Sequence, residues 1–118
     1  MTPDLGPGAQ LFANAHFFEA HEVWEERWRE MPHGEHRRAV QGLIHLAVAL
    51  EHRRRGNLRP AAGQWEKSKD KLRHGCSGAP FDVAAVLAAV APCLDAAARG
   101  ETVAVPDLAW VALTTPGV

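Results

Sequence analysis

The sequence has few cysteines, no tyrosine and no long apolar run, and these absences exclude whole classes of protein. Its two cysteines, Cys76 and Cys93, form no Cys-x-x-Cys pair and are too few to staple a small fold, so we expect free thiols. No apolar run approaches the roughly 20 residues needed to span a bilayer. Residues 1–10 have neither the basic start nor the apolar centre of a secretion signal, and we expect a cytoplasmic protein.

The sequence also lacks an excess of charge of either sign. Thirteen Lys and Arg stand against 14 Asp and Glu, which gives a net charge of −1. The distribution is uneven, because residues 1–36 carry net −5 and residues 37–74 carry net +7. We expect the acidic segment to lie beside the basic one. The basic segment has little aromatic interleaving, so solvated helix faces are favoured over phosphate or RNA binding, which would be strongly salt-dependent.

The abundant residue types favour helices over sheet. The chain has 21 Ala and 11 Leu, against 10 Val, 1 Ile and 4 Thr. Its 118 residues suit one domain, so residues 1–118 are expected to form a single helical domain. The fold class predicted is all-α, a compact bundle of about four helices with a short apolar C-terminal tail.

Breakers mark the ends of the first two helices. A first helix is predicted over about residues 9–30, before Gly34. A second is predicted over about residues 36–55, and Gly56 and Asn57 end it because both residue types tolerate the left-handed conformation.

Two further helices and a tail complete the predicted bundle. The third helix covers about residues 60–73, and the fourth begins after the capping residue Asp82 and is kinked or split by Pro92. Trp110, in the apolar piece 108–113, is expected to pack back on the bundle. The buried stripe of the third helix is Ala61, Trp65, Ser68 and Leu72, and that of the fourth is Val83, Val86, Leu87, Val90 and Leu94.

Polar side chains interrupt the apolar face of the first helix. This face is formed by Phe17, Trp24 and Trp28, flanked by Ala13 and Phe18. His21 and Glu25 lie in the same arc, together with Asn14. Burying an ionisable pair is costly unless its members are hydrogen-bonded, neutralised or bound to a metal. A helical His-x-x-x-Glu pair can supply one nitrogen and one carboxylate to the same divalent ion.

The second helix, apolar around most of its circumference, carries a polar stripe formed by Gln41, His45 and His52. If this stripe faces His21 and Glu25, the pocket suits one divalent transition metal ion, either zinc, manganese or iron. His21 and His52 would be nitrogen ligands, and Glu25 a ligand or the catalytic general base of a hydrolase acting on a small substrate. The other predicted pocket residues are Asn14, Trp28 and Gln41.

A second interpretation needs neither metal nor turnover. His21, Glu25, Gln41 and His52 would then form a buried hydrogen-bond network that fixes the helix register. The protein would be a non-catalytic interaction or scaffold protein, with a homodimer through the fourth helix or the tail around Trp110. Both interpretations stay open at this point, and so does the question of whether the protein is an enzyme.

Three segments of the sequence resemble a known family. Residues 17–28 read FFEAHEVWEERW, residues 41–44 read QGLI, and residues 54–57 read RRGN. In this order they resemble the domain-of-unknown-function family numbered 309, a family of small bacterial and archaeal proteins. Its hallmark is a His-x-x-x-Glu-x-x-(Trp or Tyr) motif, matched here by the residues His21, Glu25 and Trp28.

The resemblance covers a family-like core of about residues 11–72. It implies a compact all-helical bundle and a metal-binding role for the motif. Two positions depart from the family pattern: His45 stands where glutamine often follows the Gly-Leu-Ile run, and Glu51 stands where an aromatic residue or histidine is commoner. His52 fits the pattern.

Overall fold

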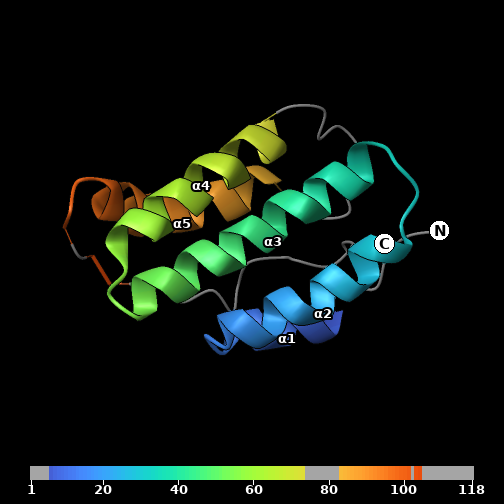
Figure 1. The fold of residues 1–118 in the computed structure, drawn as a ribbon, viewed down its shortest axis with the longest axis horizontal. Helices are drawn as coiled ribbons and strands as arrows, with labels where there is room; N and C mark the ends of the chain where they lie inside the picture. Colours follow the sequence, from blue (N-terminus) through green and yellow to red (C-terminus); the bar gives the residue numbers. More distant parts are fainter. Residues whose placement is uncertain (1–5, 74–82, 102, 105–118) are drawn as a thin grey trace.

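The computed structural model describes residues 6–73, 83–101 and 103–104, and these residues contain five α-helices and no strand (Figure 1). The helices are α1 (Gly6–Ala13), α2 (Phe17–Glu30), α3 (Glu35–Arg54), α4 (Leu58–Arg73) and α5 (Val83–Ala98). The predicted all-α class is confirmed. None of these helices is long and apolar enough to cross a membrane. The tail around Trp110 lies outside the described residues.

The α3 helix lies at the centre of the fold. It contacts α2 on one side and α4 on the other, and α5 packs on α4 and also reaches α3 (Figure 1). Its apolar residues point in most directions around the helix axis, so a single neighbouring helix cannot cover them. The buried residues of α3 are Ala39, Val40, Gly42, Leu43, Ile44, Leu46, Ala47, Ala49, Leu50 and Glu51.

The first predicted helix is divided in two, which corrects the single helix expected over residues 9–30. α1 ends at Ala13, and Ala15 adopts a left-handed conformation with φ of 65°. The Ala15 and His16 amides donate to the carbonyl oxygens of Phe12 and Leu11, at 3.0 and 2.8 Å, and this pairing closes the helix. The break carries no glycine or proline, and its one local signal is Asn14, a residue type that favours helix ends.

The reversal at this break folds α1 back onto α2. The Phe12 ring lies 5.3 Å from that of Phe17 and 5.5 Å from that of Trp24, and all three side chains are buried. Gly8 allows the close approach, because a Cβ atom there would lie 2.2 Å from the Trp24 indole nitrogen. Phe17 and Trp24 occupy the core as predicted, whereas Phe18 is 44% exposed.

The junction of α3 and α4 follows the prediction closely. Gly56 has φ of +81°, and the Asn57 amide donates to the His52 carbonyl oxygen at 2.8 Å, as in a glycine-terminated helix. The predicted stripe of α4 is buried, namely Ala61, Trp65, Ser68 and Leu72. The Trp65 indole N–H donates to Asp95 of α5 at 2.7 Å, which ties α4 to α5.

The crossing of α3 and α4 depends on a small residue. The Ser68 hydroxyl donates to the Gly42 carbonyl oxygen at 2.8 Å. A Cβ atom on Gly42 would lie 2.6 Å from Leu72 Cγ and 3.2 Å from Lys71 Cβ. The absence of a side chain at residue 42 therefore sets how closely the two helices approach.

α5 continues through Pro92 from Val83 to Ala98, so of the two predicted outcomes the split does not occur and the kink stays a prediction. Val86, Val90 and Leu94 are buried, as predicted. The Cys93 thiol is also free and buried, and this burial raises its pKa. The capping role predicted for Asp82 falls outside the described residues.

The left-handed Ala15 gives a stability prediction. Ala15→Gly should raise the free energy of unfolding by about 1 kcal/mol, because glycine adopts this conformation without the Cβ clash that alanine has there. Urea unfolding at neutral pH measures the change. In the matched control Ala88→Gly, on the exposed face of α5, a loss of about 0.5–1 kcal/mol is expected. Equal losses of stability in Ala15→Gly and Ala88→Gly would contradict the left-handed conformation assigned to Ala15.

The close α3–α4 crossing gives a second prediction. Gly42→Ala and Gly63→Ala each add one methyl group to a helix, but only the first meets a neighbouring side chain. Both gain helix propensity, so their difference isolates the packing cost. We expect Gly42→Ala to be less stable than Gly63→Ala by about 1–3 kcal/mol in urea unfolding. Equal stabilities would show that the crossing tolerates the methyl group.

Candidate functional site

The pairing of α2 and α3 determines which predicted site residues meet. Only residues 31–34 join the two helices, so they run antiparallel (Figure 1). The beginning of α2, with Phe18 and His21, therefore lies beside the end of α3, with Glu51 and His52. The end of α2, with Trp28, lies beside the beginning of α3.

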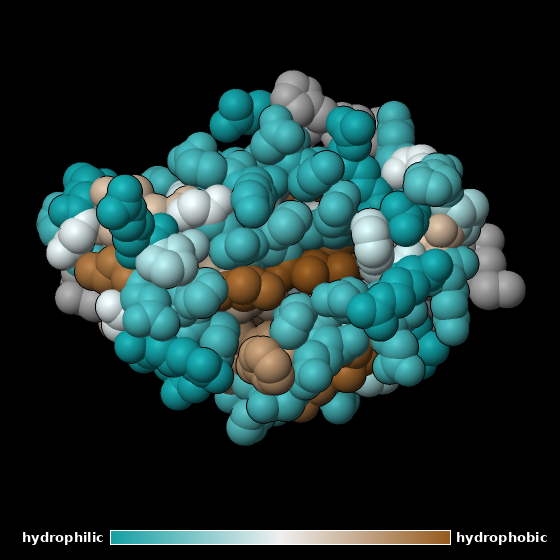
Figure 2. All heavy atoms as spheres, in the orientation of Figure 1, coloured by the Kyte–Doolittle hydropathy of each residue, from teal (hydrophilic) through white to brown (hydrophobic). Residues whose placement is uncertain are grey.

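Two histidines of the predicted ligand set share one cavity. Its volume is about 240 Å³, and it is lined by Phe18, His21, Val48, Glu51, His52 and Arg55. We call it the histidine cavity. Figure 2 shows the surrounding surface as mostly hydrophilic, with a band of apolar side chains along α3 between α2 and α4.

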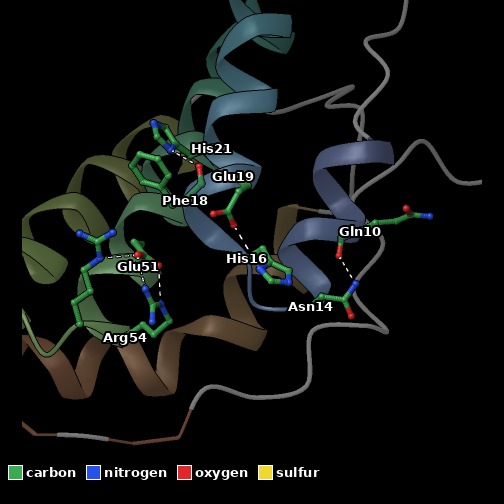
Figure 3. A network of polar contacts seen from close by, with 9 residues as sticks. Gln10, Asn14, His16, Phe18, Glu19, His21, Glu51 and Arg54 are labelled. Atoms are coloured by element: carbon green, nitrogen blue, oxygen red, sulfur yellow. Dashed lines mark hydrogen bonds and ion pairs between the residues drawn. The ribbon is translucent and has the colours of Figure 1, made fainter.

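His21 is held in one orientation by the turn that precedes it. Its Nδ1 lies 2.7 Å from the Phe18 carbonyl oxygen (Figure 3). Because a carbonyl oxygen only accepts, Nδ1 carries the proton and donates. In the neutral imidazole, Nε2 then presents a lone pair. Metal-binding histidines use the same arrangement, with one ring nitrogen bonded to a backbone carbonyl and the other free for the ion.

Glu25 faces this lone pair. Its Oε2 lies 3.6 Å from His21 Nε2, and the two side chains are 34% and 18% exposed. A carboxylate oxygen and an imidazole lone pair repel each other unless a proton or a metal ion lies between them. The other carboxylate oxygen accepts a hydrogen bond from Arg29, one turn further along α2. The negative charge of Glu25 is thus partly neutralised by Arg29.

His52 lines the same cavity from α3. Its Nδ1 is buried and has no hydrogen-bond partner among the residues that the structure describes. Among the described residues, however, no group of three or more His, Cys, Asp or Glu side chains is arranged to hold a metal ion. His21 and Glu25 are the two predicted donors that the structure places side by side, and the metal ion and its three-residue ligand set with His52 stay a prediction.

Glu51 is a site residue that the sequence analysis did not identify. It is 7% exposed, and Arg54 donates to both of its carboxylate oxygens, at 2.9 and 2.8 Å (Figure 3). Arg55 adds a third hydrogen bond, at 2.6 Å. The Arg54 hydrogen bond is the main reason that the pKa of Glu51 falls to about 2; burial opposes this shift and Arg55 adds to it.

A sequence signal for this cluster existed in the run of arginines after Glu51. A carboxylate three and four residues before Arg54 and Arg55 is spaced for ion pairs on one helix face. The burial of Glu51 was not visible in that spacing, because it depends on α2 covering the end of α3. With its charge balanced by two guanidinium groups, this carboxylate is less available to a metal ion than Glu25.

The remaining predicted residues lie elsewhere. Gln41 lines a different pocket at the beginning of α3. Trp28 packs under Arg37, whose guanidinium carbon lies 3.8 Å from the indole centroid. Asn14 directly follows α1, and its side-chain amide donates to the Gln10 carbonyl oxygen at 3.0 Å (Figure 3). His45 pairs with Gln64 of α4 at 2.8 Å, so it faces away from α2.

Known proteins match part of the chain. A family model described as Domain of unknown function (DUF309) matches residues 6–64, half of the chain. A protein of Bacillus subtilis (strain 168), "Uncharacterized protein YpuF", is 46% identical over 48 residues, which are 41% of this chain and 28% of that protein. The chain thus spans less than a third of this relative. No solved structure matches.

The Glu51 cluster predicts how stability depends on acid. A carboxyl whose pKa is lower in the folded state stabilises the protein above its unfolded pKa, and this contribution disappears as the pH falls through the folded value. For Glu51 the window runs from 4.5 down to about 2. We expect the cluster to contribute about 1–2 kcal/mol at neutral pH, less than the pKa alone implies, because water screens the exposed arginines.

Glu51→Gln should therefore remove part of the acid dependence of the free energy of unfolding. Urea unfolding at neutral pH and at several values across this window measures it. The control Glu66→Gln removes an exposed carboxylate that pairs with Lys69. It should leave the loss of stability at acid pH unchanged. If the free energy of unfolding of wild type and of Glu51→Gln fell equally as the pH is lowered, the assigned role of the cluster would be wrong.

Proposed function

The chain belongs to the domain-of-unknown-function family DUF309, and we propose that it binds a divalent transition metal ion between α2 and α3. The observation that carries this proposal is the fixed orientation of His21, whose Nε2 faces the Glu25 carboxylate at 3.6 Å. An imidazole nitrogen and a carboxylate oxygen at this separation suit zinc, manganese or iron.

His52 is the third donor that we infer. It comes from a different helix and lines the same cavity as His21, and no described residue bonds to its buried Nδ1. Ligands from two helices would couple metal binding to the α2–α3 packing, so a bound ion would also stabilise the fold. The family hallmark contains two of these three residues, His21 and Glu25.

Hydrolysis of a small substrate is the chemistry such a site would support. A bound divalent ion would supply Lewis acidity and a water of lowered pKa. Glu25 would accept a proton from this water, and the hydrogen bond from Arg29 to the carboxylate oxygen that faces away from His21 would orient it. Phe18 and Val48 would give the apolar part of a substrate a surface to contact.

A second candidate function is a non-catalytic interaction protein. The observation in its favour is that the acidic side chains have partners within the protein, Glu25 with Arg29 and Glu51 with Arg54 and Arg55. His21 also has a partner in the Phe18 carbonyl oxygen. In this case the network fixes the α2–α3 register without a metal. The homodimer expected from the sequence would belong to this interpretation.

Metal content distinguishes the two functions. Tag-free protein purified without chelators, then incubated with zinc, manganese and iron, should carry about one equivalent of one metal by elemental analysis. His21→Ala and His52→Ala should lose it. His36→Ala is the matched control, because His36 is exposed and lies outside the histidine cavity, and it should retain the metal.

The same variants report on the alternative. Wild-type protein that binds none of the three metals would overturn the metal proposal, as would full metal content in His21→Ala. The second candidate function predicts that His21→Ala lowers the free energy of unfolding by about 1–3 kcal/mol with no metal bound to either protein, which urea unfolding measures.

A further inference from the structure

A second cavity lies at the opposite end of the α2–α3 seam. It holds about 480 Å³ and is lined by His33, Gly34, Glu35, Arg37, Arg38, Gln41 and Lys71. We call it the arginine cleft. The volume falls within the range of small-molecule sites. Its lining comes from the loop before α3, the first turns of α3 and the end of α4, three parts of the chain that only the fold brings together.

Positive charge dominates the arginine cleft. Arg37, Arg38 and Lys71 stand against the single carboxylate Glu35. In the described part of the chain, Arg37 and Arg38 form no ion pair, whereas Arg29 and Arg54 each bind a glutamate. Two guanidinium groups in one cavity without a carboxylate partner repel each other, and an anion bound between them would relieve this repulsion.

Arg37 is held in place by the aromatic ring beneath it. Its guanidinium stacks on the Trp28 ring, with the central carbon 3.8 Å from the ring centroid. Among the described residues, its Nε is buried without a hydrogen-bond partner, and so is the neighbouring Trp28 Nε1. Both atoms only donate. Arg37, which lines the cleft, therefore has a buried donor that needs an acceptor.

The backbone adds to the attraction for an anion. α3 has 20 residues, and its N-cap residue is Gly34, which has no side chain to bond to the amides of the first turn. The amide groups of this turn and the positive end of the helix dipole favour negative charge. Arg37, Arg38 and Lys71 add full positive charges at this helix N-terminus. The two features together make the anion site.

We propose that the arginine cleft binds the phosphate group of a small phosphorylated molecule. Guanidinium groups match phosphate oxygens in pairs, and Gln41 can hydrogen-bond to the rest of such a molecule. An extended nucleic acid fits less well, because α2 next to the cleft exposes Glu26 and Glu30, which repel a polyanion. The Trp28 ring face is covered by Arg37, so it offers no surface for base stacking.

Titration calorimetry with inorganic phosphate and pyrophosphate tests this proposal. Full-length protein treated with chelator is used, so that a metal ion in the histidine cavity cannot bind the phosphate. Saturable binding of pyrophosphate at constant ionic strength is expected. Arg38→Gln and Arg37→Lys should each weaken it by about tenfold, the first by removing an exposed charge and the second by replacing the paired guanidinium donors.

Arg59→Gln is the matched control, because it removes an exposed arginine of α4 that lies outside the cleft. Its affinity should equal that of wild type. The absence of saturable binding, or equal weakening by Arg59→Gln, would overturn the proposal. Tighter binding of a single-stranded RNA than of pyrophosphate, lost steeply with added salt, would assign the cleft to nucleic acid instead.

Discussion

Burial of α3 requires cover from three other helices, because its apolar residues occupy most of its circumference. α4 approaches closely at Gly42, where a side chain would collide with Leu72. α2 covers the other side and is itself covered by α1, through the contact of Phe12 with Trp24. The position of every candidate site residue on α2 and α3 follows from this arrangement.

The antiparallel pairing of α2 and α3 gives their seam two chemically different ends. One end holds His21, His52 and Glu51, with the glutamate neutralised by arginines of its own helix. The other end holds Arg37 and Arg38, which form no ion pair with any described residue. Imidazole and carboxylate donors favour a cation at the first end, and guanidinium groups favour an anion at the second. A single chain of this size can thus present two separate binding chemistries.

The sequence predicted some of this fold because the signals were local. Gly56 ended α3, and the spacing of Trp65 and Leu72 defined the buried face of α4, as the structure confirms. The break at Ala15 was missed because alanine favours helices. The closing hydrogen bonds of the Ala15 and His16 amides and the packing of Phe12 against α2 compensate its left-handed conformation. Pro92 did not split α5, since packing on both sides of the proline keeps the helix together.

The sequence by itself determined the helical class, the polar residues on the apolar face of α2 and the His21–Glu25 pair, because four residues span about one helical turn. Only the tertiary structure decided which of the α3 residues meet that pair. Gln41 and His52 lie on one border of α3, but 11 residues separate them by about 16 Å. In an antiparallel pair of helices, His21 therefore lies beside His52. Gln41 lies at the other end of α3, where it lines the arginine cleft.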